Sequence, residues 1–435
     1  MKRDLLHLVI GVLCGLLLAG ILRFVLPDSG DADVARYREV RDFVRANYVR
    51  PVTDQALLES ALHGMVEDLD RYSRFLGREQ VAEFERETGG RYRGIGVVFR
   101  DPPRDGQVLF CLPDSPAERA GIRVGDRLIS VDGVRLADMQ DGDLSRRVAA
   151  ASDTSIDLVL ASRDGEERSV SLETRELVDP TVRHARVLDS DRGIGYLAIT
   201  SFSHQTPDEF DRAIEDVTAQ GARALVLDVR GNPGGVLSSA VRVANRFLAG
   251  GVVVTTEGRA ESTSYEAAPG EARYADLPLV VLIDSDSASA SEVLAGALQD
   301  HRAAVLVGAP TYGKGMVQKI RAFGEHDAIV KLTSSYYYTP AHRNLERTVE
   351  KAWEFGLMPD FAVDVPAAER KRVHTFLATH TPPRSALDEL RRWEQEDGLD
   401  LIPEPPPDAE LDAAVALLSG ERPRRLASAA EGSAR

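Results

Sequence analysis

The sequence lacks the features of disulfide-stabilised, metal-binding and nucleic-acid-binding proteins. Its 435 residues include 2 cysteines, and one of them, Cys14, lies in an apolar N-terminal segment, so a disulfide framework is excluded. Acidic residues outnumber Lys and Arg by 69 to 53, and this net charge of −16 argues against a nucleic-acid binder, which needs a basic face. Neither a His-Glu-x-x-His sequence nor a cysteine cluster is present, so we expect no metal site.

Lysine is also scarce, because 47 of the 53 basic residues are arginine. The lysines are Lys2, Lys314, Lys319, Lys331, Lys351 and Lys371. A desolvated lysine can lose its proton near neutral pH and an arginine cannot, so each lysine in this chain invites a chemical explanation. The hydrophobic content of 43% is enough for a packed core. The length indicates about two to four domains of roughly 100–200 residues.

The N-terminus has the pattern of a membrane anchor. Residues 5–26 form an apolar stretch, broken only by His7 and Arg23, that is long enough to span a bilayer as a helix. Lys2 and Arg3 precede it, which places the rest of the chain outside the cytoplasm. The alternative is a cleaved signal peptide, although no clean small-x-small cleavage site follows the apolar stretch. We therefore expect a protein on the periplasmic face of the bacterial inner membrane, anchored there or, after cleavage, soluble in the periplasm.

Three regions with different periodicity follow. Over residues 33–88, apolar residues such as Val40, Phe43 and Met65 recur at helical spacing and predict helices with packing faces. Residues 93–175 contain short strand-like runs between Gly and Pro turns. The predicted strands are 96–100, 107–112, 128–131, 156–160 and 169–172.

Residues 193–335 alternate strand and helix, which indicates an α/β core with helices covering a parallel sheet. The predicted strands are 194–200, 224–229, 279–283 and 303–307, and helices are expected at 236–248 and 290–300. A further helix begins at Thr206, with Thr206 as N-cap and Glu209 in the capping-box position. In the tail, Ser385 caps a helix that carries Leu390 and Trp393, and another helix is expected at 409–418.

Residues 284–292 read Asp-Ser-Asp-Ser-Ala-Ser-Ala-Ser-Glu and join a predicted buried strand to a predicted helix. A serine at this junction lies at the positive end of the helix, where an oxyanion is stabilised. Ala288 and Ala290 are small enough to let a peptide backbone approach. The alternative is a serine-rich loop with a capping serine.

Residues 311–315 read Thr-Tyr-Gly-Lys-Gly and follow the strand predicted at 303–307, so they emerge at the same edge of the sheet. A neutral Lys314 amine beside a serine is a working general base, and Gln318, four residues on, is placed to orient it. The alternative is an exposed lysine in a turn. The flanking glycines and the scarcity of lysine argue against that alternative.

Residues 228–235 read Asp-Val-Arg-Gly-Asn-Pro-Gly-Gly and follow another predicted strand. The amide of Gly235 is a candidate oxyanion donor, with the amide of Ala290 as the second. A glycine-rich turn after a strand is common and is a weak signal by itself. It is not a P-loop, and no Gly-x-Ser-x-Gly elbow occurs. His301 is predicted about 15 Å from Ser289 along the helix, too far for a triad.

In this order, these segments resemble the serine–lysine C-terminal-processing peptidases, also called tail-specific proteases. The resemblance is carried by residues 227–235, 287–300 and 311–318 and extends over about residues 35–366. It implies that Ser289 is the nucleophile, that Lys314 is the general base and that Gln318 positions Lys314. The oxyanion donors are then the amides of Gly235 and Ala290. The chain has Asp286 where the family usually has Gly, and Tyr312 where Phe is more usual.

The family also implies a PDZ domain inserted before the catalytic core. A PDZ domain adds a peptide C-terminus to a strand, while loop amides capture the carboxylate. Gly94, Ile95 and Gly96 stand where that loop belongs, and Val97 begins the receiving strand. The alternative is an ordinary turn into a strand.

We therefore predict an α/β core of the ClpP/crotonase type, with helices covering a sheet, an inserted PDZ domain of β-sandwich or barrel-like form, and helical segments at both ends. The predicted domains are a signal anchor (1–30), an N-terminal helical region (31–92), the PDZ domain (93–176), the peptidase core (177–366) and a helical, Pro-rich tail (367–435).

The predicted function is that of an exported serine endopeptidase. It cleaves periplasmic proteins recognised through accessible, apolar C-termini, and its PDZ domain gates their access to the dyad. It needs no cofactor, and it does not bind nucleic acid. The resemblance further implies a homo-oligomer and an activator or adaptor protein. The alternative is a PDZ adaptor with an inactive peptidase core, against which the presence of Ser289, Lys314 and Gln318 argues.

Overall fold

The computed structural model describes residues 29–100, 105–140, 142–151, 155–324, 328–347 and 355–421. The predicted membrane anchor lies outside these ranges. No helix within them combines the length and the apolar character that crossing a bilayer requires. The chain divides into two units, one of residues 1–78 with 320–332 and one of residues 79–319 with 333–435.

The described part of the first unit contains two helices and segments of three strands. Its elements are α2 (Ser29–Asn47), α3 (Asp54–Glu67), β1 (Arg74–Gly77), the last part of β17 (Met316–Phe323) and the first part of β18 (Ala328–Tyr338). Strand β1 pairs antiparallel with residues 328–331 of β18. Thr53 is the N-cap of α3, and its hydroxyl accepts a hydrogen bond from the amide of Ala56 at 3.2 Å.

Helix α4 (Arg78–Gly89) then leads toward the next domain, so the helices predicted over residues 33–88 are confirmed apart from β1. The expectation that their apolar stripes are packed is wrong for Val40, Phe43 and Met65. These side chains face solvent and are 57%, 67% and 64% exposed.

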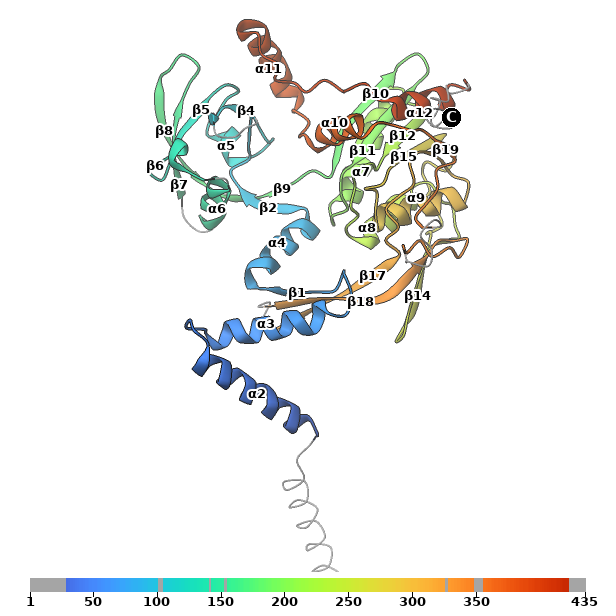
Figure 1. The fold of residues 1–435 in the computed structure, drawn as a ribbon. Coiled ribbons are helices and arrows are strands. Elements are labelled where there is room, and N and C mark those ends of the chain that lie inside the picture. Colours follow the sequence, from blue (N-terminus) through green and yellow to red (C-terminus); the bar gives the residue numbers. More distant parts are fainter. Residues whose placement is uncertain are drawn as a thin grey trace, which may run out of the picture. The chain divides into compact units, whose positions relative to one another are not determined.

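Residues 91–178, in the second unit, form a small β-rich domain (Figure 1). Its elements are β2 (Arg91–Gly94), β3 (Val97–Phe99), β4 (Val108–Cys111), α5 (Pro116–Arg119), β5 (Arg127–Val131), β6 (Val134–Arg135), α6 (Asp143–Ala150), β7 (Ser155–Ala161), β8 (Glu167–Glu173) and β9 (Arg175–Val178). Alternate residues of these strands, such as Val108, Leu128 and Ile156, meet in one buried cluster. The predicted strands are confirmed to within about two residues at each end.

The second unit also holds a six-stranded sheet with the order β10-β11-β12-β15-β16-β19. Its strands are β10 (Val182–Asp189), β11 (Ile194–Ile199), β12 (Ala224–Asp228), β15 (Leu279–Ile283), β16 (Val305–Gly308) and β19 (Phe361–Ala362). Strands β11, β12, β15, β16 and β19 run parallel, and β10 pairs antiparallel with β11. Strands β11, β12 and β15 are buried along their whole length, as expected for largely apolar strands of a parallel sheet covered on both faces.

Helices cover both faces of this sheet. Helices α7 (Thr206–Ala219), α8 (Leu237–Ala244) and α9 (Ala290–Asp300) pack on one face. Helix α7 begins at Thr206, but the expected capping box is wrong, because Gln205 is the N-cap. Glu209 instead accepts hydrogen bonds from the amides of Thr181 and Val182 at 2.7 and 3.0 Å, where the chain enters β10.

A second group of strands lies beyond the predicted core elements. It comprises β13 (Val252–Gly258), β14 (Ser262–Glu266), β17 (Met316–Phe323) and β18. Strand β13 pairs antiparallel with β14 and with residues 335–338 of β18. Strand β17 follows directly on the lysine segment of the candidate site.

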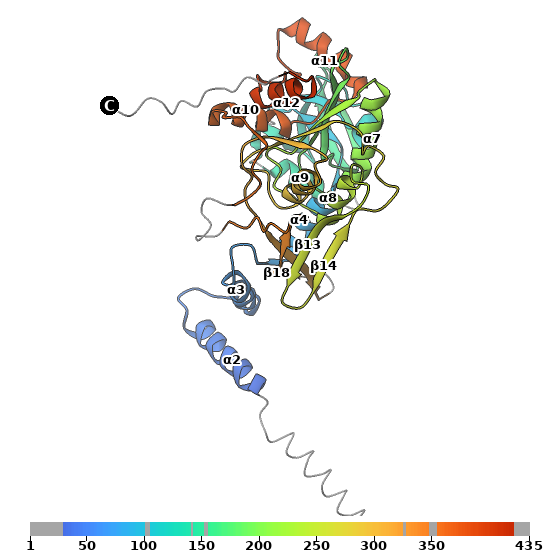
Figure 2. The ribbon, with the colours of Figure 1, turned by 90° about the vertical axis from the view of Figure 1, so that its right-hand side faces the viewer.

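The tail is packed rather than separate. Helices α10 (Ala367–Ala378) and α12 (Ala409–Leu418) cover the second face of the six-stranded sheet, where Val373, Leu377 and Ala414 meet Val226 and Leu282 (Figures 1 and 2). The helix expected to begin at Ser385 is α11 (Arg384–Asp397), and its N-cap is Pro383.

Helix α11 packs on the β-rich domain instead of the sheet. Leu390 and Trp393 share a buried cluster with Phe110 and Val124. The guanidinium of Arg163, between β7 and β8, lies 5.5 Å from the Trp393 ring and 2.9 Å from the carboxylate of Glu396.

Candidate active site

Three loops meet at the carboxyl edge of the parallel strands. We name them the glycine loop (229–235, after β12), the serine loop (284–289, after β15) and the lysine loop (309–315, after β16). The amide of Ala288 and the hydroxyl of Ser291 both donate to the carbonyl oxygen of Asn232 at 3.0 Å. The amide of Tyr312 donates to the carbonyl of Ser287 at 3.0 Å. The serine loop is therefore hydrogen-bonded to both of its neighbours.

Ser289 occupies a strained position at the start of α9. Its φ and ψ angles are 56° and −114°, a conformation that a residue with a side chain rarely adopts. Its side chain is partly exposed, while Ala288 and Ala290 on either side are buried. Such strain is typical of a functional site, where the surrounding structure holds one residue in a costly conformation.

The glycine loop passes directly against this serine. A Cβ atom on Gly234 would lie 2.8 Å from Cβ of Ser289, and one on Gly235 would lie 2.1 Å from the carbonyl oxygen of Phe202. The φ angles of these glycines are 102° and 138°. Among the described residues, neither the Gly235 amide nor the Ala290 amide donates to a protein acceptor. The two predicted oxyanion donors therefore remain available to a ligand.

Glu292 links the serine loop to the lysine loop. Its side chain is fully buried, and its Oε2 accepts from the amides of Ser289 and Lys314 at 2.8 and 2.9 Å. Its Oε1 accepts from the Thr311 hydroxyl and the Gly313 amide at 2.6 and 2.8 Å. Burial raises the pKa of Glu292, and these four donors oppose that rise.

Sequence reasoning missed Glu292. A signal was present, because Ser289 and Glu292 have the spacing of a capping box. The carboxylate does cap the helix start, but it also accepts from three groups of the lysine loop, which lies 19 to 22 residues away in sequence.

Lys314 is held at a tightly packed turn. The amide of Gly315 donates to Oε2 of Glu346 at 2.8 Å, and a Cβ on Gly315 would lie 2.5 Å from the Glu346 nitrogen. The Gln318 side-chain amide donates to the carbonyl of Met316 at 3.3 Å. Its proposed role in orienting the Lys314 amine stays a prediction.

A buried carboxylate and a histidine of α10 hold the glycine loop and the serine loop in place. The buried carboxylate of Asp284 accepts from the amides of Gly231 and Ser287 at 3.0 and 3.1 Å, and it pairs with His374 of α10. Burial alone would raise the pKa of Asp284, but the hydrogen bonds from His374 and Gly231 outweigh it and lower this pKa. The bond to Asp284 raises the pKa of His374. The carboxylate of Asp286, where the family usually has Gly, lies 3.6 Å from Nδ1 of the same His374.

The predicted carboxylate loop of the β-rich domain also has free amides. Gly94 ends β2, Val97 begins β3, and the carbonyls of Ile95 and Gly96 accept from Ala117 and Leu112 at 3.0 and 2.8 Å. Among the described residues, no acceptor pairs with the amides of Ile95 and Gly96. Gly96 has a φ of 79°, and a Cβ there would clash with Ser115.

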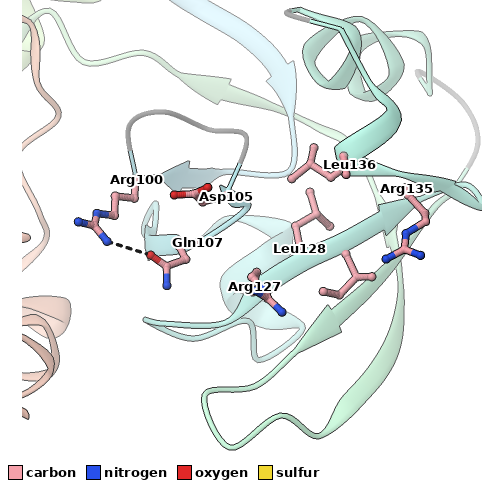
Figure 3. Close-up of a pocket in the computed structure, with 9 residues that line it drawn as sticks. Arg100, Asp105, Gln107, Arg127, Leu128, Arg135 and Leu136 are labelled. Carbon is pink, nitrogen blue, oxygen red and sulfur yellow. Dashed lines mark hydrogen bonds between the residues drawn. The ribbon is translucent and has the colours of Figure 1, made fainter. Parts of the chain in front are cut away.

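The same domain contains a polar hollow of about 520 Å³, lined in part by Arg100, Arg127 and Arg135. Figure 3 shows Arg100 and Arg135 extending from opposite sides of it. Arg100 is engaged by Gln107 at 3.2 Å. The three guanidinium groups do not converge on one point, so we assign the hollow no ligand.

Other titratable groups lie outside the site. His301 caps the end of α9, and its Nε2 lies 2.7 Å from the carbonyl of Val252. Within the described ranges, no group of three His, Cys, Asp or Glu side chains is arranged to hold a metal ion.

Comparison with known proteins gives matches over most of the chain. The model of peptidase family S41 matches residues 193–363, and a PDZ-domain model matches residues 112–162. The carboxy-terminal-processing protease of Bartonella bacilliformis is 30% identical over 399 residues, covering 89% of this chain and 88% of that protein. The carboxyl-terminal-processing protease of Synechocystis is 32% identical over 329 residues, covering 74% and 75%. The solved photosystem II D1 C-terminal processing protease shows 27% identity and a TM-score of 0.43, covering 80% of this chain and 98% of that one.

Proposed function

The chain belongs to peptidase family S41 and is a carboxy-terminal-processing protease, and on this premise we propose that Ser289 and Lys314 form its catalytic dyad. Lys314 Nζ takes the proton of the Ser289 hydroxyl as Oγ attacks the scissile carbonyl. The amides of Gly235 and Ala290 donate to the oxyanion. The C–N bond then breaks, the amine leaves with the proton from Lys314, and water hydrolyses the acyl-enzyme.

One observation carries this proposal: the backbone amides of Ser289 and Lys314 share one oxygen atom of Glu292. Two residues 25 positions apart in sequence are thereby fixed to one buried carboxylate. A capping serine and a surface lysine would need no such common support. The strained backbone of Ser289 supports the same assignment, as do the amides of Gly235 and Ala290, which donate to no acceptor within the described part of the chain.

For substrate recognition, we propose that the PDZ domain binds the free C-terminus of a protein and gates its access to the dyad. The substrate carboxylate would meet the amides of Ile95 and Gly96, and its chain would extend β3 as an added strand. Val97 and Phe99 pack against the interior of the domain, which favours apolar C-terminal residues.

The proposed location is the periplasmic face of the inner membrane, and its support is the apolar stretch at residues 5–26 with Lys2 and Arg3 before it. We further propose self-association or an activator protein. The exposed apolar residues Val40, Phe43 and Met65 support this assignment.

The dyad is tested by proteolysis of an unfolded substrate with an apolar C-terminus, with the full-length chain in detergent. Ser289→Ala and Lys314→Ala are compared with wild type, and Lys319→Ala is the matched control because Lys319 is exposed and paired with Glu261 at 2.7 Å. We expect cleavage by wild type and Lys319→Ala only. Cleavage by Ser289→Ala at the wild-type rate would refute the proposal.

The role of the PDZ domain is tested with two substrates that differ only at the C-terminus, one with a free carboxylate and one with an amide. We expect the substrate with the C-terminal amide to have a higher KM or not to be cleaved, because it lacks the negative charge that the backbone N–H groups of Ile95 and Gly96 would bind. Equal cleavage of the two substrates would show that the carboxylate is not recognised.

A further inference from the structure

Arg230, the second residue of the glycine loop, is buried and surrounded by three carboxylates. Its guanidinium binds Asp228 on the preceding strand, with Nη2 2.6 Å from Oδ2. It also makes a two-pronged contact with Asp408, at 2.8 Å from Nη1 to Oδ1 and 2.6 Å from Nη2 to Oδ2. Nη1 donates to Glu410 Oε2 at 2.6 Å. The guanidinium is therefore held by carboxylates from two distant parts of the chain.

Two of those carboxylates come from the tail. Asp408 is the N-cap of α12, and its Oδ1 accepts from the amide of Leu411 at 3.0 Å. Helix α12 packs on the sheet through Ala413 and Ala414, and this packing delivers Asp408 and Glu410 to Arg230. An arginine buried without these partners would carry an uncompensated charge, so the loop and the helix depend on each other.

From Arg230 the contacts continue to the oxyanion donor. Gly231 donates to Asp284, Asn232 donates through its side chain to the carbonyl of Ile199 at 2.8 Å, and the Gly234 amide donates to Asn232 Oδ1 at 2.8 Å. The glycine loop thus has an anchor at each of these residues, and its N-terminal anchor is the contact between Arg230 and α12.

We infer that Asp408 and Glu410 are positioning residues for the reaction. Through them, α12 holds the glycine loop in the position from which the Gly235 amide can donate to the oxyanion. The inference rests on the proposed role of Gly235. Neither residue touches the substrate, and both act through Arg230. The C-terminal helix is on this view a part of the active-site support rather than an appendage.

Glu410 has a further feature that suits this role. Its second carboxylate oxygen, Oε1, is buried and has no hydrogen-bond partner among the described residues. Burial raises the pKa of Glu410 to about 7. Its charge is therefore held in place chiefly by Arg230, and the two groups must be considered together.

The test compares Asp408→Asn, Glu410→Gln and the double variant with wild type in the full-length chain. The matched control is Glu421→Gln. Glu421 follows α12 and forms an ion pair with Arg192, between β10 and β11, at 2.8 Å. This variant therefore also removes an ion pair between the region of α12 and the sheet, but one in which no residue of the glycine loop takes part. We expect the double variant to lower kcat about tenfold to a hundredfold with KM unchanged, somewhat less than the loss of an oxyanion donor itself. Glu421→Gln keeps the wild-type kcat.

Hydrogen exchange over residues 231–236 provides a readout that does not need activity. We expect the amides of this peptide to exchange faster in the double variant than in Glu421→Gln. The two variants are compared at temperatures equally far below their own melting temperatures, so that a difference in global stability does not cause the effect. Wild-type kcat and unchanged exchange in the double variant would overturn the inference and show that α12 only packs. If wild type does not cleave, or Ser289→Ala cleaves equally well, the proposed function fails instead, and exchange alone decides whether α12 positions the loop.

Discussion

Ser289 and Lys314 donate their backbone amides to the same atom, Oε2 of Glu292, at 2.8 and 2.9 Å. The contact involves main-chain groups, so it fixes where each residue lies whatever rotamers their side chains adopt. It also means that a displacement of one loop is transmitted to the other through a single buried carboxylate.

The first prediction concerns that carboxylate. Glu292→Gln keeps the shape but turns one oxygen into an NH₂ group that faces N–H or O–H donors. An unsatisfied buried donor costs about 1–3 kcal/mol, which displaces the two loops, and a misplacement of reacting groups by about 1 Å can cost about a hundredfold in rate. We expect kcat to fall about tenfold to a hundredfold, measured with the proteolysis assay on protein shown to be folded by circular dichroism.

Glu209→Gln is the control, because Glu209 is also buried and accepts from the Thr181 and Val182 amides, but it belongs to α7. It should lower the melting temperature and leave kcat unchanged. If both variants lost stability and neither lost kcat, Glu292 would be a structural residue only.

The second prediction tests the backbone strain at Ser289. Both Ser289→Ala and Ser289→Gly lack the nucleophile and should be inactive. Glycine adopts the φ of 56° without a Cβ penalty, so we expect Ser289→Gly to be more stable than Ser289→Ala by about 1 kcal/mol in urea unfolding. Ser291, two residues on within α9, should show the opposite order, because glycine weakens a helix interior by roughly 0.5–1 kcal/mol relative to alanine. The same order at both positions would mean that Ser289 is unstrained.

The third prediction concerns the close approach of the glycine loop. Gly234→Ala places a Cβ 2.8 Å from Cβ of Ser289 and from the carbonyl oxygen of Ala288, so the loop must move away from the nucleophile. We expect at least about a hundredfold loss of kcat, the scale of a lost oxyanion donor. Gly221→Ala provides the comparison, since Gly221 has a similar φ of 99° but open space around it. That variant should retain kcat, and a loss there would attribute the effect to backbone strain alone.

The fourth prediction is a pH dependence of stability. The bond to Asp284 raises the pKa of His374, so the folded protein holds that proton more tightly than the unfolded chain. The resulting stabilisation is complete below the ordinary pKa of about 6.5 and is lost as the pH rises through the raised pKa. Asp286 adds to the upward shift, and Arg230 acts against it.

We therefore expect the melting temperature of wild type to exceed that of His374→Gln most at pH 6, and this difference to shrink toward pH 9. The titration of Glu410, whose raised pKa of about 7 also lowers stability as the pH rises, is common to both proteins and cancels in the comparison. A difference that stays constant across this range would show that the pKa of His374 is the same in the folded and the unfolded protein.

The sequence predicted the strands and helices of the α/β core well, because their signals are local. Strands β12 and β15 are continuous aliphatic runs, and α9 begins and ends where it was expected, at residues 290 and 300. Strands β13, β14, β17 and β18 were missed. Their faces are partly exposed and carry many polar residues, and their pairing partners lie far away in sequence.

The site shows the same division. The order of the three loops follows from parallel strands, so the meeting of Ser289, Lys314 and Gly235 at one edge was predictable. The groups that support the loops were not. Asp408 and Glu410 reach Arg230 from about 180 residues away in sequence, and no local pattern marks either as its partner.

The cluster between α11 and the PDZ domain has a mechanical consequence. The domain is attached to the core by its two chain ends and, through Trp393 and Leu390, by a third point. Burying two such side chains contributes roughly 1.5–3 kcal/mol each, which favours movement of the domain together with α11. Residues 399–402 belong to the same packed cluster, so a swing of the PDZ domain together with α11 would bend the chain at 379–383 and 403–408, and the second of these stretches ends at Asp408. Spin labels on α11 and β7 would keep their separation during such a swing, whereas a changing separation would show that the cluster opens.

Deleting residues 93–175 would remove the PDZ domain and expose Trp393 to solvent. It would also remove the surface that holds α11, and so disturb the segment that ends at Asp408. Point variants in the carboxylate loop therefore report on substrate recognition more cleanly than removal of the whole domain.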